Sequence, residues 1–567
     1  MPTHTPEQIH QRRWWILSVL CLSLLIVFVG NSSLNVTLPT LSRELHATES
    51  QLQWLVAIYS LVFAGLLFTT GALGDRFGRK GALQLGLLIF LCGAGLASTS
   101  SSMTELIGCR ALMGVGAAFI MPSTLSILIN VFPPHERTKA IAIWASVTGA
   151  AGGFGPVISG LLLAHFWWGS VFLINVPLLL LALVAGYFLV PTSRDPEEAP
   201  LDPIGAVLST LGVVSVVYGL IQAPQNGWGS PATLGAFGAG VVLLTVFGFW
   251  ERRQAEPMLD IGYFRNPAFS TGTGGMVLVF MAMYGVMFLI TQYFQLVLNY
   301  TALSASLRLM PLALIMLIVA PLTPRISAAL GTNRTVAIGM SLVALGLILF
   351  RGLTPHTPYW YVVVAIIPLT TGIAMTMAPM TAAIMSAVPL RRAGSGSAMN
   401  DATRELGAAL GIAVLGSVAA SRYANALHHA TDHLTPAQQS ASKGSLAGAQ
   451  ATAATLRPAA DKALTTAANH AFVDGVHLAV TVGAIMALFA AACVLKWLPR
   501  QLAHQGEAET GQESLEVTAE FALAGGFPIT AEELDHDDDE LARHDAEQSR
   551  AGHEPNEDAQ FEADPAR

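Results

Sequence analysis

The chain has 567 residues, of which 53% are hydrophobic and 12% are charged, and its mean hydropathy is +0.55. Soluble domains carry about 25% charged residues, so this composition excludes an ordinary soluble enzyme, a disordered protein and a basic nucleic-acid binder. The net charge of −8 is unevenly distributed: residues 1–500 hold 26 Lys and Arg against 18 Asp and Glu, whereas residues 501–567 hold 3 against 19. The sequence therefore predicts a weakly basic membrane body followed by an acidic tail.

Fourteen runs are long and apolar enough to cross a membrane, which requires about 20 mostly apolar residues. The first run is too long for a cleavable signal peptide and is not followed by a small-residue cleavage site. The weak alternation of β-barrel strands is missing. We therefore predict an all-α membrane protein with fourteen transmembrane helices. The predicted spans are 14–38, 53–73, 81–100, 105–130, 139–163, 169–190, 204–222, 232–250, 268–297, 303–323, 335–353, 359–388, 396–420 and 474–498.

The orientation of these spans follows from the positions of Lys and Arg between them, because cytoplasmic loops are enriched in both. With the N-terminus inside, the inward segments hold 17 Lys and Arg and the outward segments hold 6. Four of those six lie in one long loop, where the rule counts least. We expect both termini to be cytoplasmic and the protein to reside in the cytoplasmic membrane.

Two segments are predicted to lie in water. The loop 421–473, which is rich in Ala, Thr, Ser and His, is predicted to be extracellular and can form a short exposed helix pair. The tail 501–567 is predicted to be a disordered cytoplasmic segment. Its acidic run from Glu532 is not an EF-hand, because Glu540 and Ala546 stand where that loop requires Gly and Glu.

No cofactor or metal site is predicted. The stretch 74–80 does not meet the G-x-x-x-x-G-K-[ST] spacing of a phosphate-binding loop, so transport energy would have to come from an ion gradient or a partner. The cysteines all lie in apolar runs and offer no disulfide framework or zinc cluster. They are Cys21, Cys92, Cys109 and Cys493.

The inward loop between spans 2 and 3 reads Gly-Ala-Leu-Gly-Asp-Arg-Phe-Gly-Arg-Lys over residues 71–80. This stretch resembles the signature of the major facilitator superfamily, G-x-L-(A/G)-D-R-x-G-R-(K/R). Glycines let two helix ends approach closely, and Asp75 can pair with an Arg or a helix N-terminus on the facing bundle. Such a pair would hold the cytoplasmic side shut until the protein rocks open. The gating residues are Gly71, Gly74, Asp75, Arg76, Gly78, Arg79 and Lys80.

Two more motifs follow in the order that this family shows. Arg110 opens a pattern in span 4 that is similar to R-x-x-x-G-x-G-(A/G)-(A/G), and an intramembrane guanidinium marks function unless it snorkels to an interface. Span 5 resembles the G-P-x-x-G-G motif of proton-driven exporters, with Ser159 in place of one glycine. Small residues there also serve plain helix packing. The antiporter-motif residues are Gly152, Gly155, Pro156 and Gly160.

The resemblance covers about residues 20–500, and the chain is identified as a member of the fourteen-span drug:proton antiporter branch, similar to actinobacterial multidrug and antibiotic exporters. It implies two six-helix bundles related by a pseudo-two-fold axis. A degenerate repeat of the gating motif, without its acid, occurs at Gly331 and Arg334. The implied units are a cytoplasmic N-terminus 1–13, a bundle 14–190, a cytoplasmic linker 191–203, an inserted pair 204–250 and a second bundle 268–498.

The departures from the family pattern bear on the substrate. Gly30 and Ala57 stand where relatives usually carry acids in spans 1 and 2, which lowers the expectation of a specialist for dications. Aromatic and polar side chains could line a cavity, although each has an ordinary packing role as the alternative. These cavity candidates are Asn31, Asn35, Trp54, Tyr59, Gln292 and Gln295.

Span 13 carries the predicted proton-coupling site. Asp401 and Glu405 are four residues apart and share a helix face, with Arg404 beside them and Arg110 as a further candidate. They lie roughly 8–14 Å inside their run. Desolvation favours the protonated form and Arg404 the ionised form, a balance that suits a group gaining and losing a proton. The alternative is that Asp401 complements the N-terminus of span 13 and that Arg404 and Glu405 form a structural pair.

Together these features predict a proton-coupled exporter of amphipathic drugs, working as a monomer in the bilayer on small-molecule substrates and protons, without nucleic acid or cofactor. Two alternatives stay open: an exporter of a dedicated metabolite or lipid, and a membrane sensor or scaffold that signals through its acidic tail. The gating motif and the buried charges favour transport over sensing.

Overall fold

The computed structural model describes residues 6–193, 202–254, 257, 259–388 and 393–500, and every regular element within them is a helix. The predicted tail 501–567 lies outside these residues. Within these residues, thirteen helices are long and apolar enough to span a membrane, which confirms the all-α membrane class. The count of fourteen stays a prediction, because the predicted span 139–163 falls in a long helix whose described apolar part, Ala151–His165, is shorter than a span.

The described part of the N-terminal half contains eight helices, and capping side chains stabilise the starts of α3 and α5. The Thr48 hydroxyl accepts a hydrogen bond from the backbone N–H of Gln51, whose side chain in turn accepts the Thr48 N–H, and Ser102 caps the backbone of Glu105. Such caps satisfy donors that a helix start leaves free. The helices are α1 (Pro6–Ser32), α2 (Leu34–Glu44), α3 (Glu49–Phe77), α4 (Arg79–Thr99), α5 (Met103–Val131), α6 (Pro134–His165), α7 (Ser170–Leu173) and α8 (Asn175–Leu189).

The predicted inserted pair corresponds to α9 (Pro203–Asn226) and α10 (Pro231–Glu251), which pack against each other. Helix α9 also packs against α3 and against α17 of the other half. Helix α10 instead exposes Val241, Val242 and Phe249, each by more than half of its surface. Because lipid tails solvate such side chains, we assign this face to the bilayer.

The C-terminal half contains the remaining helices, including two in the predicted outer loop. The expected helix pair is therefore present, but its second helix is not exposed, since Leu446 and Ala449 are buried against the bundle. The helices are α11 (Pro267–Gln292), α12 (Ala302–Arg308), α13 (Met310–Val319), α14 (Thr323–Leu330), α15 (Thr332–Leu349), α16 (Tyr359–Ser386), α17 (Ala393–Leu427), α18 (Pro436–Gly444), α19 (Leu446–Ala453) and α20 (Pro458–Trp497). Short irregular helices are η1 (Ile261–Arg265), η2 (Tyr293–Val297, a π-helix), η3 (Ala320–Leu322), η4 (Phe350–Gly352) and η6 (His429–Thr431).

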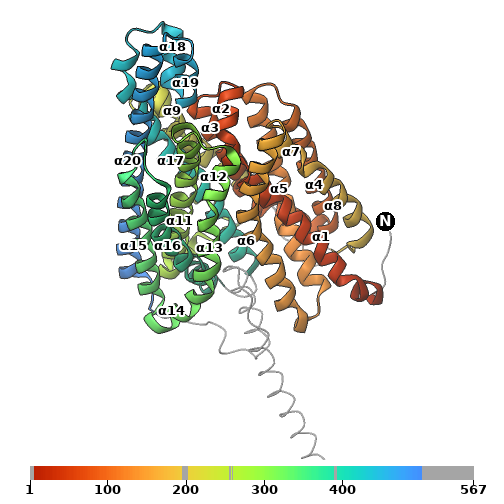
Figure 1. Ribbon diagram of the computed structural model, residues 1–567. Helices are drawn as coiled ribbons and strands as arrows, with labels where there is room; N and C mark the ends of the chain where they lie inside the picture. The colour runs from red at the N-terminus through yellow and green to blue at the C-terminus, as the bar shows by residue number, and fades with distance from the viewer. Residues whose placement is uncertain (1–5, 194–201, 255–256, 258, 389–392, 501–567) are drawn as a thin grey trace, which may run out of the picture. The chain divides into compact units, whose positions relative to one another are not determined.

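The two ends of the helix bundle can be told apart by their connections. Helices α2, α18 and α19 lie at one end, at the top of Figure 1, and α14 reaches the other end. We call the first the outer end, which is predicted to be extracellular, and the second the inner end. The α3–α4 and α14–α15 turns lie at the inner end because the spans alternate in direction.

Candidate transport site

Arg110 of α5 lies in the interior of the N-terminal half. Its side chain is fully buried. Its Nη2 lies 3.1 Å from Oδ1 of Asn31, its Nε 3.3 Å from the carbonyl oxygen of Leu55 and its Nη1 3.4 Å from that of Gly30. The guanidinium carbon also lies 4.3 Å from the centroid of the Tyr59 ring. These contacts rule out the snorkelling alternative.

The acids of span 13 lie on α17, facing the N-terminal half. Glu405 is 8% exposed, and its Oε2 has no hydrogen-bond partner. The Ser60 hydroxyl of α3 faces the same carboxyl group. One turn earlier, Oδ1 of Asp401 lies 3.8 Å from Nη1 of Arg404, whose guanidinium carbon is 5.8 Å from the Phe280 ring centroid.

Glu405 lies close enough to Arg110 and Arg404 for their charges to attract its carboxylate, and close enough to Asp401 for the two carboxylates to repel each other. The four residues predicted for proton coupling are therefore brought together, from α5 on one side and α17 on the other. We call them the charge cluster: Arg110, Asp401, Arg404 and Glu405. The cluster lies where the two halves meet, and opposite charges there offset part of the cost of burial.

Two of the predicted cavity residues instead join the halves at the outer end. The amide of Gln292 in α11 donates to Oε1 of Glu49 in α3, over 3.0 Å. The amide of Gln295 donates to the carbonyl oxygen of Val36 in α2, over 2.9 Å, and Nη2 of Arg43 donates to the carbonyl oxygen of Gln295, also over 2.9 Å. In this structure these side chains are hydrogen-bonded partners at an interface, and their role in lining a cavity stays a prediction.

A fourth cross-half hydrogen bond lies along α3 and α17, where the Ser417 hydroxyl donates to Oε1 of Gln53, over 3.2 Å. Gln53 is fully buried, and its Nε2 has no partner. We call this hydrogen-bonded interface at the outer end the outer seam, and it comprises Val36, Arg43, Glu49, Gln53, Gln292, Gln295 and Ser417.

Glu49 and Gln53 are not among the residues predicted from the sequence. Glu49 precedes the apolar run of predicted span 2, and Gln53 is the first residue of that run. The missed signal is the spacing of Glu49, Gln53 and Ser60, which places three polar side chains on one face of a helix.

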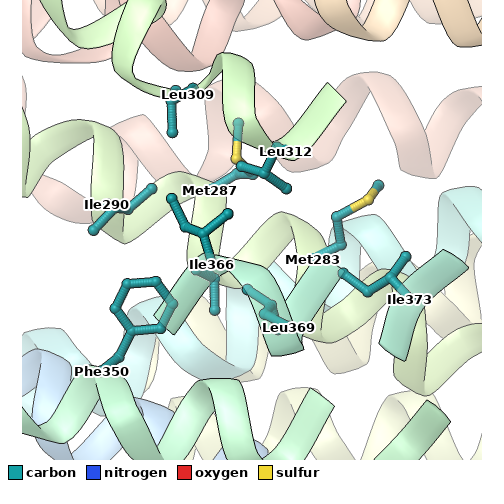
Figure 2. Close-up of a pocket in the computed structure, with 10 residues that line it drawn as sticks. Met283, Met287, Ile290, Leu309, Leu312, Phe350, Ile366, Leu369 and Ile373 are labelled. Carbon is teal, nitrogen blue, oxygen red and sulfur yellow. The ribbon is translucent and has the colours of Figure 1, made fainter. Parts of the chain in front are cut away.

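The other predicted cavity residues have packing roles. The Trp54 ring lies 6.1 Å from that of Tyr218 in α9, and the Tyr59 hydroxyl donates to the carbonyl oxygen of Val27 over 3.4 Å. Asn35 is buried in α2, and its Oδ1 has no hydrogen-bond partner. None of the six predicted cavity residues lines the pocket shown in Figure 2, which is entirely apolar and lies within the C-terminal half.

That pocket is formed by α11, α13, α16, η4 and the residue that joins α12 to α13. Figure 2 shows aliphatic, methionine and phenylalanine side chains converging on it. Such a lining offers no polar group that could orient a ligand. Its residues are Met283, Val286, Met287, Ile290, Leu309, Leu312, Phe350, Ile366, Leu369 and Ile373.

The gating motif forms the turn between α3 and α4. Nε of Arg79 donates to Oδ1 of Asp75 over 2.7 Å, one helical turn apart. Nζ of Lys80 donates to the carbonyl oxygen of Tyr187 over 2.8 Å, and the Arg76 guanidinium carbon lies 5.7 Å from the Phe77 ring centroid. The structure thus places Asp75 against its own motif, whereas the expected pair would reach the facing bundle.

The motif glycines lie at close approaches. A Cβ atom added at Gly71 would contact Pro122, and one added at Gly74 would contact Ala82 and Ser123. Gly78 has a φ of 119°, a conformation that glycine adopts without steric cost.

The antiporter motif on α6 packs against both halves. At Gly155 an added Cβ would overlap the Ser32 side chain, and the Ser33 hydroxyl donates to the Gly155 carbonyl oxygen over 3.0 Å. Gly160 lies against Ser306 of α12, whereas Gly152 has no atom near its Cβ position. Pro156 sits inside the helix, next to Gly155. Gly155 and Gly160 are therefore contact points at which α6 meets the break between α1 and α2 and the opposite half.

The helical halves and the charge cluster between them define a polytopic transporter. The family model of the Major Facilitator Superfamily matches residues 20–412. The chain belongs to the Major Facilitator Superfamily; it is a membrane transporter of small molecules and not an enzyme.

Relatives of this chain include efflux, export and resistance proteins. The multidrug efflux pump LfrA of Mycolicibacterium smegmatis is 35% identical over 87% of this chain and 97% of its own length. The tetracenomycin C resistance and export protein of Streptomyces glaucescens is 32% identical over 87% and 93%. The methyl viologen resistance protein SmvA of Salmonella typhimurium is 31% identical over 85% and 97%. These relatives support multidrug efflux and a place in the bacterial cytoplasmic membrane.

Solved structures share the fold at low identity. A bacterial homologue of the lysosomal transporter Spinster has a TM-score of 0.58 at 17% identity and covers 85% of this chain and 98% of its own. A peptide transporter, POT, has a TM-score of 0.56 at 15% identity, with coverage of 85% and 95%.

Proposed function

We propose that this transporter exports amphipathic drugs or antibiotics out of the cell in exchange for protons. The charge cluster carries the proposal: two acids and two arginines are packed between halves that must move relative to each other. The similarity to a multidrug pump, an antibiotic exporter and a methyl viologen resistance protein indicates the class of cargo. A dedicated exporter of one metabolite is the second candidate, because the tetracenomycin C protein is named as a resistance and export protein for one compound.

Glu405 is the proposed proton carrier. Its Oε2 lacks a hydrogen-bond partner, so a proton can bind there without displacing another donor. Desolvation favours the neutral carboxyl, whereas Arg110 and Arg404 favour the carboxylate. A movement of α17 against α5 changes the distance from Glu405 to Arg110 and so shifts this balance. Asp401 pairs with Arg404 and so partly neutralises the positive charge that Arg404 presents to Glu405.

Transport by alternating access requires the halves to separate at one end at a time. The outer seam joins them through hydrogen bonds from α2 and α3 to α11, η2 and α17, while the Asp75–Arg79 and Lys80–Tyr187 contacts of the gating motif lie within the N-terminal half. This arrangement supports a state that is closed at the outer end. When the outer seam opens, water can hydrate the unpaired Nε2 of Gln53, and Asp75 becomes available to the opposite half.

Two measurements test the proposal. Drug accumulation in a pump-deficient bacterial host, with and without a protonophore, tests export: expression should lower accumulation, and the protonophore should abolish the difference. If accumulation is equal with and without expression across many compounds, the drug-export hypothesis is contradicted. The dedicated exporter of one metabolite then remains as the candidate function.

Coupling is tested in proteoliposomes with an imposed pH gradient. Glu405→Gln should abolish uphill transport, Asp401→Asn should reduce it about tenfold or more, and both should still bind substrate. Asp461→Asn, which removes an acid near the N-terminus of α20, is the matched control and should behave as wild type. If both span 13 variants still drive uphill transport at wild-type stoichiometry, the coupling site lies elsewhere.

A further inference from the structure

Three potential metal ligands gather at the C-terminal end of α17, away from the charge cluster. His428 Nδ1 lies 3.6 Å from Oδ1 of Asp432, and His429 Nδ1 lies 3.7 Å from Oδ2 of the same carboxylate. All three ligand atoms lie within 4.8 Å of one another. The transport proposal does not account for this group.

The backbone holds these residues in place. After α17 ends at Leu427, the chain makes the tight turn η6, in which residues three apart lie on the same side. Thr431 is fully buried, and its hydroxyl donates to the carbonyl oxygens of His428, over 2.9 Å, and Leu427, over 3.3 Å. The ligands therefore project from a turn that is anchored by a buried threonine and a buried leucine, which lowers the cost of arranging them.

The separations suit one metal ion. Zinc binds histidine nitrogen at about 2.0–2.1 Å and carboxylate oxygen at about 2.0–2.2 Å, so tetrahedral ligand atoms lie roughly 3.4 Å apart. The two His–Asp separations need to shorten by a few tenths of an ångström, and the two imidazole nitrogens, which lie within 4.8 Å of each other, by about 1.4 Å at most. Two imidazoles and one carboxylate favour Zn²⁺ and its transition-metal neighbours over Mg²⁺ or Ca²⁺, which prefer oxygen ligands.

We propose that His428, His429 and Asp432 form a binding site for a divalent transition-metal ion, with Zn²⁺ as its preferred occupant. The side chains are 63%, 96% and 48% exposed. The ion therefore enters directly from solvent, and water or the adjacent His433 supplies the fourth ligand. The proposal does not depend on the transport mechanism, because the site lies on the predicted extracellular surface.

The full chain, purified in detergent with any affinity tag removed, should be titrated with Co²⁺ and then with Zn²⁺. Tetrahedral Co²⁺ absorption in the visible region should saturate at one ion per chain, and Zn²⁺ should displace it with a dissociation constant in the micromolar range. The double variant H428A/H429A should weaken binding at least tenfold, and Asp432→Asn should weaken it too.

His356→Ala, which removes an exposed histidine from the loop between α15 and α16, is the matched control and should leave the titration unchanged. Thermal unfolding curves that match the wild type would show that the variants are folded. Unchanged stoichiometry and affinity in H428A/H429A would overturn the proposal and assign the ion to adventitious binding. His433→Ala separates the two possible fourth ligands, since only a coordinating histidine would change the Co²⁺ spectrum.

Discussion

At the inner end, the turn between α3 and α4 and the turn between α14 and α15 have the same backbone. Each contains one glycine with a positive φ, 119° at Gly78 and 89° at Gly331. In each, the next N–H donates to a carbonyl oxygen that follows the last helix of its half: Arg79 to Ser193 over 3.0 Å, and Thr332 to Arg500 over 2.9 Å. The degenerate repeat of the gating motif at Gly331 is therefore also a repeat in the backbone structure.

The two turns differ in charge. The first has the Asp75–Arg79 ion pair and the buried Lys80, whereas residues 323–334 contain no acid. Ala328, three residues before Gly331, is the counterpart of Asp75. The shared backbone serves the fold of both halves, so the charge found in only one half is the feature that can serve gating.

The largest effect is expected from Asp75→Asn. The carboxylate is partly exposed and pairs within one helical turn, so its loss should cost little stability. We expect transport to fall at least about tenfold because the inner end loses its closing partner, while the amount of protein in the membrane stays unchanged. Drug efflux from energised cells measures the first, and quantitative immunoblotting of membranes the second.

Ala328→Asn is the matched control, since it changes the equivalent exposed position in the other half. Wild-type efflux is expected for this variant. Wild-type efflux in Asp75→Asn would show instead that the acid has no gating role and that the two turns are functionally alike.

A second test examines the shared backbone. Gly78→Ala and Gly331→Ala both force alanine into a positive φ, which costs about 1–2 kcal/mol. At Gly331 the new Cβ would also lie 2.7 Å from Cγ of Arg500, whereas at Gly78 the nearest atom, the carbonyl oxygen of Ser193, is 3.9 Å away. Both variants should lower the Tm in detergent, Gly331→Ala by more. A Tm equal to wild type in either variant would contradict the strained-turn interpretation.

The sequence predicts this fold well because the thickness and the apolar interior of a membrane set the length and the hydropathy of each span. Apolar runs located the helices, and the spacing of Arg404, Asp401 and Glu405 placed three charges on one face of α17. The motif glycines Gly74, Gly155 and Gly160 also occur at close contacts, and Gly78 occurs at a turn with a positive φ.

Other features depend on contacts between distant segments, which no local pattern encodes. Gln292 and Gln295 resembled cavity residues because their partners, Glu49 and the Val36 carbonyl oxygen, are far away in sequence. For the same reason, Asp75 was expected to face the opposite bundle, although in this arrangement Arg79 is its neighbour. The meeting of Arg110 with Glu405 also required the structure, since the two lie in different halves.

The smallest effect is expected from Lys80→Met, the last element that distinguishes the two turns. Lys80 is 2% exposed, and its Nζ donates to the Tyr187 carbonyl oxygen and lies 5.5 Å from the ring centroid of that tyrosine. Methionine keeps the apolar stem but leaves the carbonyl oxygen without this donor, which costs about 1 kcal/mol. We expect a fall in Tm of about 1–3 °C and efflux within about twofold of wild type. Arg334→Met, at an exposed position in the second turn, should change neither. If Lys80→Met lost as much efflux as Asp75→Asn, the gating role would belong to the charges of the whole turn and not to Asp75 alone. A packing contact within one half cannot by itself close the inner end.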